Sequence, residues 1–319
     1  MSKITVIGCG GMGINVASKF IGKSETGFAE FDVYLLDTSK SNMPKGVDES
    51  KVYLFEGMDG SGKLRSSNYS TINERAKEVL QKVKPGAINL IVTSASGGSG
   101  NVIAGILVNE LLKKDVSVVV ACVGSSDSRI ETENTVKCLK SFEVISQRCG
   151  KPVIMMYGEN SADKKRGEVD HFIESNIVLM SLFFSGGNRE LDMSDLRNFL
   201  NYHKVSSYAP KLTMLDFYSG KLELNKDQAL VSLVTLTDDN TSSAVDLPVD
   251  YQAVGFINDD VKAKVRVGLP IHMATVANYF HPVIEKLEMK MATIDEARSA
   301  VVEKSILGKG ESVTDGLVF

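Results

Sequence analysis

The sequence has no tryptophan and contains only four cysteines and four histidines. The cysteines (Cys9, Cys122, Cys138 and Cys149) form no CxxC pair, and their spacing suits neither zinc nor a disulfide framework. No apolar run approaches the roughly 20 residues that a membrane-spanning helix needs. A dense Lys/Arg run is also missing, and the net charge is -4. We therefore expect a cytoplasmic protein without a secretory signal, with neither membrane nor nucleic acid as a direct partner.

At 319 residues, 43% of them hydrophobic, the chain has the size and composition of a globular protein of about two domains. Its first half alternates apolar strands with helix-like segments. The strands lack polar alternation, which is typical of a parallel sheet buried on both faces. The pattern predicts a doubly wound α/β domain, with strands at 4–8, 32–37, 51–55, 87–95, 116–124 and 152–158 and helices at 15–21, 70–83, 101–114 and 132–148.

A long helix is predicted over 163–184, ending at the cap sequence Ser185-Gly186-Gly187-Asn188. A smaller α+β unit follows, with strands predicted at 212–219, 229–237, 251–257 and 263–270 and helices at 273–289 and 294–306. The expected division is a nucleotide-binding domain (1–162), a central helix (163–187), a C-terminal domain (188–307) and a tail (308–319) that ends in Leu317-Val318-Phe319.

Two glycine loops resemble familiar phosphate-binding motifs. The stretch 7–15, IGCGGMGIN, contains Gly8-x-Gly10-x-x-Gly13, and Asp37 follows where a ribose-binding acid would lie, so this loop alone predicts a nicotinamide or flavin enzyme. The stretch 57–63, GMDGSGK, has the spacing of a Walker A loop, but Leu64 replaces the magnesium-binding hydroxyl. It remains either a flexible turn or a loop whose N–H groups wrap a terminal phosphate.

A third glycine loop, SASGGSGN at 94–101, joins an apolar strand to an apolar helix. Glycines allow close approach of the backbone to a phosphate, and the helix N-terminus supplies free N–H donors. Ser96 and Ser99 can add hydroxyl donors. A tight, Ser- or Asn-capped turn is the structural alternative. A dinucleotide enzyme needs one such loop, so several loops favour a phosphate chain held from several sides.

Together these motifs resemble the tubulin/FtsZ superfamily of polymerising GTPases, over essentially the whole chain. SGGSGN is similar to the family's GGGTGTG loop, with Ser96 for the first glycine and Ser99 for the threonine. GCGGMGINV resembles the family's first loop, and GMDGSGK falls where its γ-phosphate-sensing loop belongs. The departures from consensus and the short chain look most like the divergent tubulins of bacteriophages and plasmids, the PhuZ and TubZ groups.

The resemblance implies GTP or GDP with Mg2+ as cofactors, and it assigns no side chain as a dedicated metal ligand. It implies Glu131 as the ribose-contacting acid, although Asp127 is close enough to compete. Asn160 and Asn176 are the implied guanine readers, with Asn15 a third candidate; Asn176 has the alternative of a satisfied polar residue on a half-buried helix. The other implied nucleotide contacts are Gly10, Gly11, Met12, Asp37, Gly60, Ser61, Gly62, Ser96, Gly97, Gly98, Ser99, Gly100 and Asn101.

The stretch ELDMSDL at 190–196 resembles the family's catalytic loop, NxDxxD. Asp192 and Asp195 are the two acids, and Glu190 replaces the usual asparagine. Carboxylates at i and i+3 project from one face of a nascent helix and could orient one water. The alternative is an N-capping Asp192 with a solvated Asp195.

The resemblance implies a function as an assembly-activated GTPase. Its subunits would form head-to-tail filaments and hydrolyse GTP between neighbours, with the tail as a further filament contact. Positioning or segregation of phage or plasmid DNA or particles would follow, through a cargo adaptor, in the host bacterial cytoplasm if the chain is phage-encoded. The alternatives are a nucleotide-gated structural filament without efficient hydrolysis and a Rossmann-type oxidoreductase.

Overall fold

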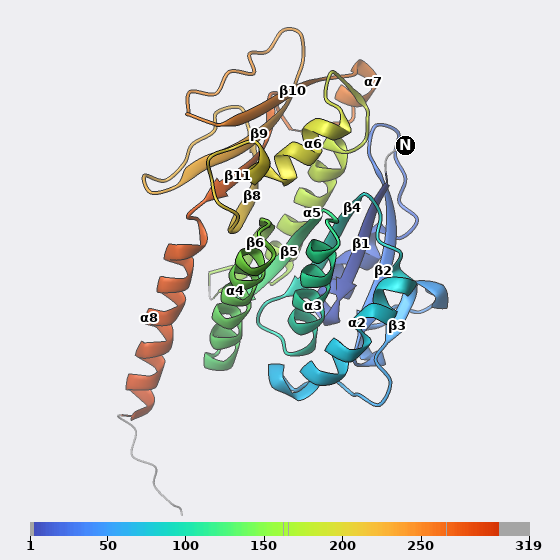
Figure 1. Cartoon of the computed structure of the whole chain (residues 1–319), viewed down its shortest axis with the longest axis vertical. Helices are drawn as coiled ribbons and strands as arrows, with labels where there is room; N and C mark the ends of the chain where they lie inside the picture. Colours follow the sequence, from blue (N-terminus) through green and yellow to red (C-terminus); the bar gives the residue numbers. More distant parts are fainter. Residues whose placement is uncertain (1–2, 162, 165, 266, 300–319) are drawn as a thin grey trace, which may run out of the picture.

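A computed structural model of the chain describes residues 3–161, 163–164, 166–265 and 267–299. Its described residues form one eleven-stranded sheet in the order β3-β2-β1-β4-β5-β6-β8-β11-β9-β10-β7. The sheet runs through the whole molecule, with helices on both faces (Figure 1).

The first six strands form the parallel half of the sheet and are nearly all buried. They are β1 (Lys3–Cys9), β2 (Glu30–Asp37), β3 (Val52–Leu54), β4 (Ile88–Ser94), β5 (Val118–Ser125) and β6 (Val153–Asn160). Successive side chains enter opposite cores, as Val6 and Ile7 of β1 do. The predicted α/β fold with a doubly wound parallel sheet is confirmed.

Helices from both halves of the chain cover the sheet. One core lies under α2 (Tyr69–Val83), α3 (Ser99–Lys113), α4 (Arg129–Cys149) and α8 (Phe280–Ser299). The opposite core lies under α1 (Gly10–Ala17), α5 (Arg166–Phe183) and α6 (Met193–Leu200). Short 3-10 turns occupy Ser18–Phe20, Lys40–Asn42, Glu49–Lys51, Arg65–Asn68 and Tyr202–Lys204.

The second half of the chain extends the same sheet. Helix α5 ends as predicted, with Gly186 in the left-handed conformation and the Ser185 hydroxyl accepting a hydrogen bond from the Gly187 N–H. β6 pairs with β8 in parallel, which joins the two halves. The remaining elements are β7 (Asn188–Arg189), β8 (Leu212–Ser219), β9 (Ala229–Thr237), β10 (Tyr251–Ile257), α7 (Asp259–Lys262) and β11 (Ile271–Ala277).

Three predictions for the C-terminal half were wrong. The described residues of 263–270 hold no strand, and 271–277 is not helical but forms β11, a strand buried between β8 and β9. One helix, α8, replaces the two predicted ones as far as residue 299. Residues 300–319, including the rest of the second predicted helix and the tail with Leu317-Val318-Phe319, lie outside the described residues.

Strand β11 was misassigned because its polar side chains are paired inside the sheet. The Thr275 hydroxyl lies 2.6 Å from that of Ser232. His272, 1% exposed, has its Nδ1 2.8 Å from the Thr235 hydroxyl and its Nε2 3.0 Å from the Gly220 carbonyl oxygen. With both faces buried, β11 shows no polar alternation, and its Met and Ala residues look helical.

We expect His272 to make the fold sensitive to acid. Burial lowers the pKa of His272, so the unfolded chain binds this proton at a higher pH than the folded chain does. Its contribution to stability is complete above the unfolded pKa of about 6.5 and declines below it, by at most about 1.4 kcal/mol per pH unit. Urea unfolding of wild type and His272→Gln at about pH 7.5 and about pH 5.5 should show the larger loss in wild type. Equal losses in the two proteins would contradict the assignment.

Candidate functional site

Two glycine turns meet backbone to backbone where β1 and β4 end. Gly10 has φ +72°, and a Cβ placed on it would lie 2.8 Å from Gly100 Cα. A Cβ on Gly100 would in turn lie 2.6 Å from the Cys9 carbonyl oxygen. Only glycine permits this approach. It brings together the N-termini of α1 and α3, where backbone N–H groups lack helical partners.

The glycine loop at 57–63 packs against the loop at 94–101. A Cβ on Gly98 would lie 1.9 Å from Ser61 Oγ and 3.1 Å from the Leu64 nitrogen. The three loops border one cleft of about 510 Å3. Ten of the residues predicted from the sequence line it: Gly10, Gly11, Met12, Asp37, Gly60, Ser61, Gly97, Gly98, Ser99 and Gly100.

The cleft can bind an anion through backbone N–H groups and hydroxyls rather than through fixed cations. Among the described residues that line it there is no Lys or Arg, whereas Asp37 and Asp59 contribute carboxylates. Burial raises the pKa of Asp37, although one of its oxygens accepts a 2.7 Å hydrogen bond from the Thr38 N–H. A polyphosphate would therefore need a cation to bind with it.

Seven other residues predicted to contact the nucleotide lie outside the lining of this cleft, and four of them belong to the stretches that carry the glycine loops. Asn101 is buried in the first turn of α3, where its Nδ2 donates to the carbonyl oxygens of Ala95 (2.8 Å) and Gly97 (2.7 Å) in the 94–101 loop. Asn101 therefore holds the loop in shape. Ser96 is half-buried in the same loop, and its hydroxyl lies 3.0 Å from that of Ser94. Gly62 is left-handed with φ +54°, and Asn15 is exposed on α1.

The acid predicted to contact a ribose, Glu131, is buried at the start of α4. Its Oε1 lies 2.5 Å from Lys63 Nζ, and its Oε2 accepts a 2.9 Å hydrogen bond from the Ser125 hydroxyl. Burial raises the pKa of Glu131, but these hydrogen bonds outweigh burial and hold the pKa below its usual value. Asp127, the competing residue, is bound to the same serine through its backbone N–H. The sequence alone did not decide between Glu131 and Asp127, and in the structure both residues are hydrogen-bonded to Ser125.

The two asparagines predicted to read a base carry unsatisfied polar atoms. Asn160 ends β6 at the same sheet edge as the glycine turns, and its Oδ1 is buried without a hydrogen-bond partner among the described residues. Asn176 is 5% exposed on α5, which packs on β6, and within that part of the chain its Nδ2 also has no partner. A buried acceptor and a buried donor of this kind would suit a guanine edge.

Asp192 and Asp195 form a capping box at the start of α6. Asp192 Oδ1 accepts hydrogen bonds from the N–H groups of Ser194 (2.6 Å) and Asp195 (3.0 Å), which lower the pKa of Asp192. Asp195 Oδ2 accepts from the Asp192 N–H at 3.1 Å, and its Oδ1 accepts from the Tyr251 hydroxyl at 3.0 Å. The alternative of an N-capping Asp192 is thus realised, while Asp195 is paired rather than merely solvated.

The acids lie at the opposite end of the sheet from the cleft. Helix α6 borders Ala87 and Ser117, which precede β4 and β5, whereas the glycine turn follows β4. Strand β4 has seven residues, and at about 3.3 Å per residue the two ends are about 20 Å apart. Figure 1 shows α6 at the end of the molecule where the chain enters β1. Within one subunit the acids therefore cannot reach the cleft.

Comparison with known proteins gives a consistent family. A phage tubulin-like protein of Pseudomonas phage PhiPA3 is 25% identical over 310 residues, covering 95% of this chain and 96% of the relative. One from Pseudomonas phage phiKZ is 28% identical over 218 residues, covering 64% of this chain and 65% of the relative. This chain is a divergent member of the phage tubulin-like family. No family model matches it.

Solved structures show that the tubulin-like fold extends over the whole chain. The protofilament of TubZ from bacteriophage PhiKZ matches with a TM-score of 0.87 at 24% identity, covering 100% of both chains. The structure of the phage tubulin PhuZ with GDP matches with a TM-score of 0.86 at 21% identity, again over 100% of both chains. These matches confirm the predicted fold class.

Three buried polar side chains that link the loops of this tubulin-like chain were missed from the sequence. Asn134 Nδ2 donates to the carbonyl oxygens of Lys63 (2.9 Å) and Ser96 (3.1 Å). Asn68 Nδ2 donates to the Gly60 carbonyl oxygen (2.9 Å), and both Asn68 and Thr38 bind the Ser99 hydroxyl. None belongs to a motif, and only their burial in the fold distinguishes them.

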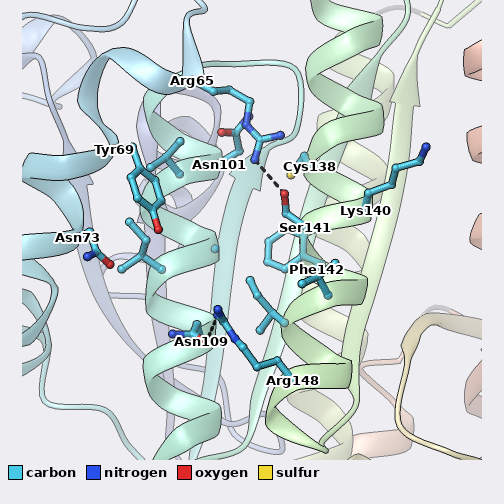
Figure 2. A pocket seen from close by; sticks show the side chains of 15 residues that line it. Arg65, Tyr69, Asn73, Asn101, Asn109, Cys138, Lys140, Ser141, Phe142 and Arg148 are labelled. Carbon is cyan, nitrogen blue, oxygen red and sulfur yellow. Dashed lines mark hydrogen bonds between the residues drawn. The ribbon is translucent and has the colours of Figure 1, made fainter.

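A separate groove of about 360 Å3 lies between α3 and α4 (Figure 2). Its basic side chains are Arg65, Lys140 and Arg148, and all three are engaged. Arg65 donates to the Ser141 hydroxyl and Arg148 to Asn109 Oδ1, while Lys140 pairs with Glu288 at 2.6 Å. Most of its lining is apolar. Gly105 is its one glycine, so the backbone cradle of the first cleft is not repeated here.

Among the described helices of this tubulin-like chain, none has the length and apolar character needed to cross a membrane.

Replacing Glu190 by Asn should stabilise the acid turn. Glu190 has φ +74°, a left-handed conformation that Asn adopts more readily than Glu. We expect Glu190→Asn to raise the free energy of unfolding by about 0.5–1 kcal/mol, measured by urea denaturation. The matched control is Glu190→Gln, which gains an amide without this conformational preference. An equal gain from Gln would contradict the backbone explanation.

Proposed function

We propose that this phage tubulin-like chain is a GTPase that assembles head to tail and hydrolyses GTP between neighbouring subunits. The observation that carries the proposal is the placement of a glycine-lined cleft and a pair of acids at opposite ends of one sheet. Stacking one subunit on the next would put the acids over the neighbour's cleft. Such a contact is heterologous and generates a filament.

In this proposal the glycine loops bind the nucleotide's phosphates. Gly97, Gly98 and Gly100 allow close approach of the backbone, and the cradle formed at the α1 and α3 N-termini fits an anion. Gly60 and Ser61 border the same cleft and would sense the γ-phosphate. Glu131 would bind the ribose, and Asn160 and Asn176 would read guanine through their unsatisfied atoms.

Magnesium fits this cleft as a partner of the phosphates. Within the described part of the chain, no group of three or more His, Cys, Asp or Glu is placed to hold a metal alone. Mg2+ is usually bound by phosphate oxygens, waters and one or two carboxylates. Asp37 and Asp59 are the carboxylates that line the cleft. When bound, the ion would neutralise charge on the phosphates.

The incoming subunit would supply Asp192 and Asp195 to orient and polarise the attacking water. Their hydrogen bonds to the α6 N-terminus and to Tyr251 hold both carboxylates in place. The low pKa of Asp192 keeps it ionised at neutral pH, as a water-orienting acceptor requires. Hydrolysis would then begin only after assembly.

The comparisons support assembly as the biological role. Two of the matched structures are a TubZ protofilament and a PhuZ201 filament, and a third is the phage tubulin PhuZ with GDP. We place the filament in the host bacterial cytoplasm, where it would position or segregate phage DNA or particles through an adaptor. Residues 308–319, beyond the described part of the chain, are proposed as a further contact between subunits.

The test is phosphate release measured beside sedimentation, with GTP, ATP and a slowly hydrolysed GTP analogue, over a protein concentration series. We expect GTP-specific pelleting, with release rising only above a critical concentration. A rate of phosphate release proportional to protein concentration over the whole series would contradict a site shared between subunits. Pelleting without release would favour the second candidate, a nucleotide-gated scaffold, which the exposed Glu190 in place of the family's asparagine supports.

A further inference from the structure

Lys63 is the last residue of the glycine loop at 57–63 and carries the one cation of that loop. Its ammonium lies 2.5 Å from Glu131 Oε1. The lysine side chain is 49% exposed, whereas that of Glu131 is 6% exposed. A half-exposed lysine on a flexible four-carbon stem is free to change partners.

The backbone at Lys63 borders the turn that would carry the phosphates. The nitrogen of Leu64, the next residue, lies 3.1 Å from the Cβ position of Gly98, the residue that caps α3. Asn134 fixes this stretch by donating to the Lys63 carbonyl oxygen at 2.9 Å. The side chain therefore starts from a fixed point next to Gly98 and extends toward Glu131, so a change of rotamer can redirect it to the turn.

Glu131 would stay satisfied without Lys63. Its other oxygen keeps the Ser125 hydroxyl at 2.9 Å, and Arg166 Nη2 lies 3.8 Å from Oε1. A ribose hydroxyl could thus replace the lysine as a donor to Oε1 without leaving a buried carboxylate unpaired. The exchange would also bring a positive charge to the cleft, whose described lining has no cation of its own.

We infer that Lys63 is a nucleotide-responsive cation, paired with Glu131 in the empty chain and transferred to the γ-phosphate when a ribose hydroxyl takes its place. This inference rests on the proposed function, since it assumes a guanosine nucleotide in the cleft. It adds a property that the glycine loops alone do not supply, namely preference for a triphosphate over a diphosphate. Lysine would act there as a point charge on phosphate oxygens.

The experiment compares equilibrium binding of a slowly hydrolysed GTP analogue and of GDP below the critical concentration. The variants are Lys63→Met, Lys63→Arg and, as a matched control, Lys137→Met, which removes an exposed lysine of α4 paired with Glu133. We expect Lys63→Met to lower the affinity for the triphosphate analogue by roughly tenfold and the affinity for GDP by much less, because a charge-assisted contact is lost only at the γ-phosphate. Lys63→Arg and Lys137→Met should keep the wild-type preference.

The outcomes separate this inference from the function on which it rests. If Lys63→Met changes both affinities by the same factor, or changes neither, Lys63 does not contact the γ-phosphate and the inference is overturned. If Lys63→Met fails to fold, Lys63→Arg decides, because its retained charge must preserve the preference. If wild type binds neither nucleotide, the proposed function itself fails.

Discussion

Replacing Asp192 by Asn is expected to lower GTP hydrolysis by roughly a hundredfold or more while assembly continues. Asn caps a helix as well as Asp does, so α6 and its contacts remain and only the carboxylate is lost. Phosphate release and pelleting, measured on the same samples, test this. The matched control is Asp48→Asn, since Asp48 caps a short helical turn elsewhere by accepting from the Ser50 N–H. Unchanged phosphate release from Asp192→Asn would refute the catalytic assignment.

The same variant can test whether the site is shared. An Asp192→Asn subunit keeps an intact cleft, and a subunit with a blocked cleft keeps its acids. Neither should hydrolyse GTP alone, but a mixture should recover activity at junctions where the intact cleft meets the intact acids. A site contained in one subunit predicts no recovery.

Gly97→Leu is expected to block that cleft without unfolding the chain. A Cβ on Gly97 meets nothing within 4 Å, and Gly97 lines the cleft. The leucine would occupy the space in which the backbone N–H groups approach a phosphate, and nucleotide affinity should fall by about a hundredfold or more. Titration calorimetry with GDP measures the loss.

Gly100→Ala is the contrasting variant in the same loop. Its Cβ would lie 2.6 Å from the Cys9 carbonyl oxygen, so the two turns would have to separate. We expect a loss of about 1–3 kcal/mol in the free energy of unfolding. If Gly97→Leu instead loses stability to the same extent, its effect on binding cannot be assigned to the cleft.

The glycine loops that line the cleft could be predicted from the sequence because each is contiguous and needs glycine for a local reason. Asn68 and Asn134 could not, since their roles depend on bringing together residues far apart in the chain, such as Asn134 with Lys63 and Ser96. Asp192 was ambiguous for a different reason. The features that make an aspartate a good cap, an exposed position and free N–H groups, also suit a water-orienting acid.

Strand β11 shows why hydrophobic periodicity alone does not identify every strand. A strand with one exposed face can be recognised in a sequence because its polar and apolar residues alternate. Strand β11 instead lies between β8 and β9 with every residue buried. Its sequence is indistinguishable by period from a buried helix. The preceding stretch, 263–270, does alternate as a half-exposed strand would, yet its described residues form no strand.

The separation of cleft and acids along the sheet has an arithmetic consequence for any head-to-tail row of these subunits. Under the proposed function, a row of n subunits would contain n − 1 complete sites, because one end subunit has no neighbour over its cleft and the other has acids that face solvent. Turnover per subunit then scales as (n − 1)/n. Short rows are slow for this reason alone, so a specific activity measured at steady state reports the mean length of the rows.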